Sequence, residues 1–138
     1  MASLHWLDSF ATGNIEIDRQ HRRIVAVLNE TEADLGAGDF AAANRCCHSL
    51  RDLLQDHFAH EERLLAEAEF PRLRSHIGTH AAARGGVEAL LAECAEKCEL
   101  GAKVGCIGRW CTLIVSHLLM ADLDFKSHLL ARDPDSRA

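Results

Sequence analysis

Two pairs of side chains that can bind a metal ion are each spaced four residues apart. His57 precedes Glu61 by four residues, and His76 precedes His80 by the same interval. Residues at positions i and i+4 of an α-helix lie on one face, so each pair can direct its ligand atoms to a common point. Each pair therefore has the spacing of two ligands to one metal ion.

Three further polar residues interrupt helical stripes that are otherwise apolar. His21 lies on the stripe of a first expected helix, and His117 lies on that of a fourth, with Asp122 five residues later. Five residues of helix end about 140° beyond a full turn. Asp122 can therefore reach the same point as His117 only from the flank, or through local unwinding of the π type.

These seven residues suit two metal ions better than one. They are His21, His57, Glu61, His76, His80, His117 and Asp122. Buried carboxylates need a positive partner, yet a tetrahedral zinc ion takes only four ligands and Ca²⁺ and Mg²⁺ prefer oxygen. Two transition-metal ions bridged by both carboxylates would share the five histidines as three and two. A bridging oxygen would then leave one coordination position open.

The elements that must position these residues are helices. The chain has 138 residues with only two prolines, and its apolar residues recur at helical rather than strand spacing. We expect one all-α domain over residues 1–138, an up-down-up-down four-helix bundle with an irregular N-terminal arm. The expected boundaries are an arm ending near Ile17, a first helix from an Asp18 cap to residues 36–38, a second from an Asp39 cap to Phe70-Pro71, a third from there, and a fourth fading at residues 129–130.

The charge and composition of the chain argue against two kinds of binding partner, nucleic acids and membranes. The net charge is −6 and no cluster of Lys or Arg occurs, so a nucleic-acid partner is not expected. No apolar run reaches the roughly 18 residues of a membrane span, and the first residues do not resemble a secretion signal. We therefore expect a cytoplasmic protein that does not bind membranes.

The six cysteines are expected to be reduced thiols or redox groups and not a structural disulfide framework, with small buried apolar residues as the favoured interpretation. Cys94 and Cys98 share a helix face, so a dithiol switch, a disulfide between subunits or adventitious metal binding is the alternative. A homo-oligomer formed through surface or thiol contacts is a further possibility. The full set is Cys46, Cys47, Cys94, Cys98, Cys106 and Cys111.

The pattern of ligands resembles the hemerythrin family, and in particular its single-domain bacterial members. The resemblance covers roughly residues 6–125 and places a residue of the right type at all seven ligand positions in order. Its motifs are Trp6, residues 15–21 (IEIDRQH), residues 57–62 (HFAHEE), Phe70-Pro71 followed by His76 and His80, and His117 to Asp122.

The resemblance implies a non-haem di-iron centre. His76, His80 and His117 would hold one iron, His21 and His57 would hold the other, and Glu61 and Asp122 would bridge them. Dioxygen would bind reversibly at the open position of the two-histidine iron. The residues implied to line the dioxygen pocket are Ile24, Phe58 and Leu118.

The function expected from the resemblance is storage, delivery or scavenging of dioxygen, without enzymatic activity. One alternative is an oxygen- or redox-sensing module, and another is a di-iron oxidase, peroxidase or nitric oxide-handling enzyme. The Glu-x-x-His pattern on two helices that is typical of carboxylate-rich di-iron proteins does not occur here. His5, His48, His60 and His128 are expected on the surface or beside the ligands, and Glu62 is expected in solvent.

Overall fold

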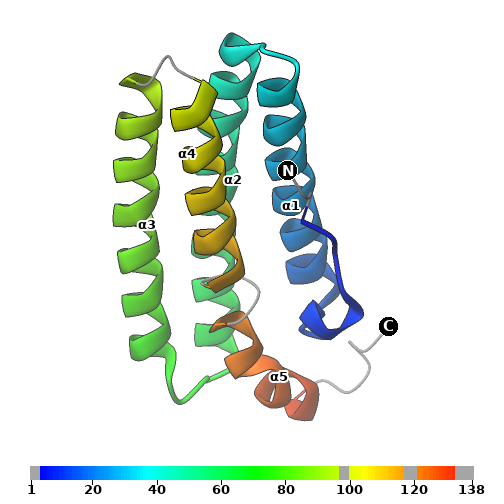
Figure 1. Cartoon of the computed structure of the whole chain (residues 1–138). Coiled ribbons are helices and arrows are strands. Elements are labelled where there is room, and N and C mark those ends of the chain that lie inside the picture. The colour runs from blue at the N-terminus through cyan, green and yellow to red at the C-terminus, as the bar shows by residue number, and fades with distance from the viewer. Residues whose placement is uncertain (1–3, 97–99, 117–120, 133–138) are drawn as a thin grey trace.

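The computed structural model describes residues 4–96, 100–116 and 121–132. Four long helices run alternately up and down, as Figure 1 shows. They are α1 (Ile15–Gly36), α2 (Phe40–Glu67), α3 (Leu73–Glu96) and α4 (Leu100–Leu113). Helix α1 packs against α2 and α4, and α3 packs against the same two helices. The predicted four-helix bundle is confirmed, and the described residues contain no strand.

The start of α1 differs from the prediction. The helix begins at Ile15, and its cap is Asn14, whose side-chain oxygen accepts a hydrogen bond from the backbone N–H of Ile17 at 2.9 Å. Asp18 lies inside the first turn. Its carboxylate instead accepts hydrogen bonds from the N–H and the hydroxyl of Thr12, at 2.8 and 2.9 Å. Asp18 therefore fastens the preceding arm to the helix instead of capping it.

The irregular N-terminal arm lies against α1. It contains one 3₁₀ turn, η1 (Asp8–Phe10). The side chain of Asn29 exchanges two hydrogen bonds with the backbone of Leu4, at 2.9 and 3.0 Å. The guanidinium of Arg22 lies 4.8 Å from the ring centroid of Trp6. The arm is therefore fixed by polar contacts as well as by apolar packing.

The ends of α2 follow local sequence signals. The side chain of Asp39 accepts a hydrogen bond from the N–H of Ala42 at 3.0 Å, which confirms the predicted cap. The helix ends at Glu67, and Glu69 has a left-handed φ of 56°. After Pro71 the chain enters α3 at Leu73. The Phe70-Pro71 pair thus lies in the turn between α2 and α3, close to the predicted boundary.

The prediction that the fourth helix continues to residues 129–130 is wrong. Helix α4 ends at Leu113, residues 114–116 adopt a π-helical conformation, and the chain resumes as η3 (Ala121–Phe125) and α5 (Lys126–Arg132). In Figure 1, α5 lies across the lower end of the bundle. There Phe125 and Leu129 join a buried apolar cluster. A straight continuation of α4 would have carried these two residues past the end of the bundle.

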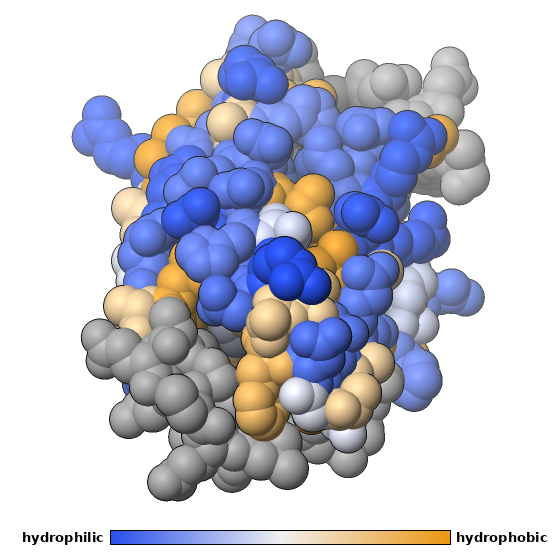
Figure 2. Space-filling view, turned by 90° about the horizontal axis from the view of Figure 1, so that it is seen from above, coloured by the Kyte–Doolittle hydropathy of each residue, from blue (hydrophilic) through white to orange (hydrophobic). Residues whose placement is uncertain are grey.

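Two apolar clusters make up the core. The larger one fills most of the bundle and includes Phe58 and Trp110, and the smaller one closes the lower end around Phe70 and Phe125. Seen from above in Figure 2, polar side chains cover most of the described surface, and apolar ones show mainly between them. No helix within the described ranges is both long enough and apolar enough to cross a membrane.

The described cysteines differ in oxidation state. Cys46, Cys47 and Cys111 are thiols, whereas Cys106 is in a disulfide bond, so the expectation of reduced cysteines is wrong for Cys106. Burial, followed by the carboxylate of Asp34, raises the pKa of the Cys46 thiol. Burial also raises the pKa of Cys111. Neither thiol therefore has the lowered pKa of a reactive cysteine.

Candidate metal centre

Five of the seven predicted ligands meet inside the bundle. His21 comes from α1, His57 and Glu61 come from α2, and His76 and His80 come from α3; none is more than 4% exposed. Such a set of titratable groups is costly to bury unless its charges and lone pairs are matched. The arrangement therefore needs a physical reason beyond packing.

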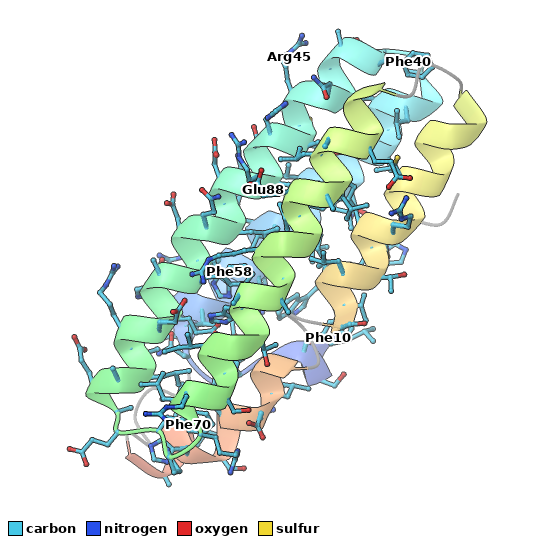
Figure 3. All side chains as sticks on the ribbon, turned by 90° about the vertical axis from the view of Figure 1, so that its left-hand side faces the viewer. Phe10, Phe40, Arg45, Phe58, Phe70 and Glu88 are labelled. Carbon is cyan, nitrogen blue, oxygen red and sulfur yellow. The ribbon has the colours of Figure 1, made fainter. Side chains whose placement is uncertain are left out.

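Apolar rings enclose these five residues on two sides. Phe58 stacks on the ring of His80 at a centroid distance of 4.4 Å, and Phe125 lies 5.4 Å from the ring of His76. Figure 3 shows Phe58 inside the bundle and Phe70 near its lower end. The site thus lies between the two apolar clusters, where the effective dielectric constant is low and charge interactions are strong.

Glu61 connects two groups of histidines. Its Oε2 atom lies 2.9 Å from Nε2 of His57, which in turn lies 3.1 Å from Nε2 of His21. Its Oε1 atom lies 2.5 Å from Nε2 of His76 and 2.9 Å from Nε2 of His80. Within each group, the ligand atoms all lie within 4.8 Å of one another. One carboxylate therefore offers a different oxygen to each group, which is the geometry of a bridging ligand.

Gln20 orients His57 from the side facing away from Glu61. Its amide oxygen lies 2.6 Å from Nδ1 of His57, and its amide nitrogen lies 2.9 Å from Nδ1 of His60. Because a carbonyl oxygen only accepts, His57 donates through Nδ1. In neutral His57 the lone pair is then on Nε2, the atom that faces Glu61 and His21.

Glu62 orients His80 in the same way. The Oε2 atom of Glu62 lies 3.1 Å from Nδ1 of His80 and 2.8 Å from a guanidinium nitrogen of Arg84. Although partial burial opposes ionisation, His80 and Arg84 lower the pKa of the Glu62 carboxyl. The expectation that Glu62 is simply solvated is therefore wrong, because its side chain is only 21% exposed and supports a candidate ligand.

The donor set fits a metal ion. With the protons of His57 and His80 on Nδ1, their Nε2 lone pairs face the oxygens of Glu61 at 2.9 Å. Two lone pairs at that distance repel unless a proton or a metal cation lies between them. Burial raises the pKa of Glu61, but contacts with His57, His76 and His80 outweigh it, and the net effect is a pKa well below the ordinary value. An ionised carboxylate amid imidazole nitrogens is a suitable ligand set for transition metals.

The remaining predicted residues divide into two sets. Ile24 and Phe58 are buried, at 1% exposure each, and both belong to the larger apolar cluster. His117 and Leu118 lie outside the described residues, and Asp122 is described only as part of the backbone of η3. The π-helical residues 114–116 directly precede His117, so the backbone is irregular just before the interval from His117 to Asp122, for which local unwinding was one of the two expected routes.

Sequence reasoning missed two supporting residues, Gln20 and Glu62. Each is adjacent in sequence to a predicted ligand, His21 or Glu61, but each contacts a histidine on a different helix. Their adjacency to a predicted ligand was the only sequence signal for a supporting role. It did not identify which histidine each of them would contact. His60, which was expected on the surface or beside the ligands, contacts Gln20.

Replacing Gln20 with leucine is expected to weaken metal binding by roughly 10- to 100-fold, the usual cost of losing the hydrogen bond that orients a ligating histidine. Competition with a chelator measures this change directly. Gln55→Leu is the matched control, because Gln55 is exposed on α2. Equal metal affinity in the Gln20→Leu variant and the wild type would show that Gln20 does not orient His57.

Comparison with known proteins agrees with this geometry. A sequence model of the Hemerythrin HHE cation binding domain matches residues 12–121. A bacteriohemerythrin of Stenotrophomonas maltophilia (strain R551-3) is 36% identical over 80 residues, which cover 58% of this chain and 52% of that protein. The same identity and coverage apply to a bacteriohemerythrin of Pseudomonas aeruginosa (strain LESB58).

A further relative is similar to this chain at lower identity. A hemerythrin-like protein of Naegleria gruberi is 32% identical over 76 residues, covering 55% of this chain and 59% of that protein. The chain spans about half the length of the curated bacterial relatives that it matches. The match to the family model includes all five residues that meet in the candidate metal centre.

Proposed function

Because this chain belongs to the hemerythrin family, we propose that it binds dioxygen reversibly at two iron ions and acts as a carrier, store or scavenger without being an enzyme. The observation that supports two ions is the division of Glu61 between two groups of histidines, one oxygen to each. A single ion would leave one of these buried groups without a positive partner. The names of the bacterial relatives support the same family of function.

The proposed ligands follow the two groups. His21 and His57 would hold one iron, His76 and His80 would hold the other, and Glu61 would bridge them. By the family resemblance, we assign His117 to the second iron and Asp122 as the second bridge. When bound, the pair of ferrous ions supplies the electrons that dioxygen takes up and returns.

The chain's own residues provide the surroundings that reversible binding requires. Phe58 and Ile24 are apolar and buried, and we assign Leu118 to the same pocket on the resemblance. An apolar wall excludes water and withholds protons from the site. Gln20 and Glu62 contact the Nδ1 atoms of His57 and His80, and so would leave the Nε2 atoms of these histidines to bind the metals. Together these residues favour release of dioxygen over its chemical conversion.

The deciding experiment is reduction without oxygen, followed by absorption spectra as dioxygen is added and then removed. We expect two irons per chain and spectral changes that reverse when dioxygen is withdrawn. One iron per chain, or zinc alone after ferrous reconstitution, would contradict the di-iron proposal. Failure to form a lasting oxygenated species, with turnover of hydrogen peroxide or nitric oxide, would favour the enzymatic alternative.

Replacing Ile24 with threonine is expected to speed irreversible oxidation of the reduced protein by about tenfold, because a polar group in a dry site is worth roughly 1–3 kcal/mol. Ile24→Val is the matched control, since it shortens the side chain without adding a hydroxyl. Stopped-flow spectra after mixing with dioxygen measure both rates. If the two variants oxidise at the same rate, polarity at this position does not control the reversibility of binding.

A further inference from the structure

A cavity of about 280 Å³ opens to solvent between α1 and α2. Its rim carries the charged residues Glu16, Arg19, Arg23 and Asp56, which are exposed. Its walls include Gln20 and Leu53, and its floor includes Ile24 and His57, each only 1% exposed. The cavity therefore leads from solvent to one of the candidate metal ligands.

The cavity reaches only one of the two histidine groups. His57 belongs to the group with His21, and none of the lining residues belongs to the group formed by Glu61, His76 and His80. In the second group, the ring of His80 is stacked on Phe58, and the guanidinium of Arg84 lies 5.3 Å from the centroid of the Phe58 ring. The two sides of the site are therefore unequally accessible from this cavity.

The chemistry of the cavity selects small neutral molecules. Its two arginines are matched by two carboxylates, and Arg19 and Glu16 form an ion pair at 2.9 Å. The rim thus has no net charge to attract an anion or a cation. Deeper in, Ile24 and Leu53 provide apolar walls, where a nonpolar gas is better accommodated than an ion.

We propose that this cavity is the vestibule through which dioxygen and other neutral diatomic gases reach the two-histidine side of the metal site, with Leu53 and Ile24 lining the passage. The inference rests on the proposed function, because it gives the dioxygen site an access route. The volume exceeds what one diatomic molecule fills, so the cavity admits gas without holding it tightly. It controls the rate of binding and leaves the affinity to the metal ligands.

Filling the passage tests the proposal. Leu53→Trp places a larger ring in the cavity, and Leu64→Trp is its matched control, because Leu64 is a half-buried leucine of the same helix outside the cavity. In the reduced iron-loaded protein, Leu53→Trp is expected to slow association of both dioxygen and nitric oxide by about tenfold, as binding then awaits a conformational opening. Dioxygen release should slow equally, so the equilibrium affinity stays unchanged.

A second readout does not depend on iron chemistry. Xenon enters apolar cavities of proteins, so ¹²⁹Xe NMR of the wild type should show a saturable shift. Leu53→Trp should abolish that shift, and Leu64→Trp should keep it. Leu53→Ala, which widens the passage, should keep xenon binding and speed association, so the test does not rest on one bulky substitution.

The outcomes distinguish this inference from the proposed function. If the wild type forms no lasting oxygenated species but Leu53→Trp still slows nitric oxide association, the dioxygen proposal fails and the access route stands. If dioxygen binds reversibly at rates that neither Leu53 variant changes, the access route is wrong and the dioxygen proposal stands. Absence of a saturable xenon shift in the wild type would also overturn the proposal that this cavity is the vestibule.

Discussion

Replacing Glu61 with glutamine is expected to remove both metal ions, lowering the iron content at least about tenfold, because metal affinity depends on a deprotonated ligand. The two oxygens of Glu61 face different histidine groups, at 2.9 Å from His57 and 2.5 Å from His76. A glutamine keeps the size of the side chain, but it has no charge and only one oxygen. The substitution should therefore affect both sites together. Metal analysis after ferrous reconstitution measures the result.

Glu67→Gln is the control for this experiment. Glu67 lies near the end of the same helix and is exposed, so its variant should keep the wild-type iron content. Circular dichroism of both variants without metal checks that the helices remain. A Glu61→Gln protein that still binds one iron tightly would show that the carboxylate serves only one of the two groups.

Removing the metal is expected to lower the melting temperature by about 10 °C or more, since a ligand present at 1,000 times its Kd adds roughly 4 kcal/mol of stability. His21 and His57 lie 3.1 Å apart beside the carboxylate of Glu61, in a site with almost no solvent contact, so loss of a bound cation would leave these buried groups unmatched. Thermal denaturation of protein with and without iron measures the difference. Equal melting temperatures would mean that the buried cluster does not hold metal.

The same comparison should depend on pH in two separate ways. In the loaded protein, protons compete with the metal for the histidine ligands, so acidification releases iron. In the metal-free protein, the folded-state pKa of Glu61 lies well below its ordinary value of 4.5. A depressed pKa stabilises the fold above the unfolded-state value, and this contribution is lost as the pH falls below 4.5. Metal-free Glu61→Gln should lack this second loss.

The ligand pairs on α2 and α3 could be predicted because helical periodicity alone determines them. His57 and Glu61 share a helix face whatever the helix packs against, and so do His76 and His80. The structure brings both pairs together with His21. The fold class could be predicted for the same reason, since each helix carries its own apolar stripe.

The supporting residues could not be predicted because they depend on packing between helices. Glu62 lies about 100° around α2 from Glu61, a direction that by itself indicates solvent. It contacts His80 only because α3 passes along that side and brings Arg84 with it. The break after α4 has a similar origin, because Phe125 is buried at the end of the bundle rather than along it.

The two histidine groups also differ in how early the growing chain can assemble them. His21, His57 and Glu61 all lie on α1 and α2, which form a single helical hairpin ending at Glu67. His76 and His80 lie on α3, so the second group must wait until that helix has been synthesised and has docked. Translation therefore imposes an order on the ligands: His21, His57 and Glu61 next to the α1–α2 cavity are synthesised first, His76 and His80 on α3 follow, and the assigned ligands His117 and Asp122 come last.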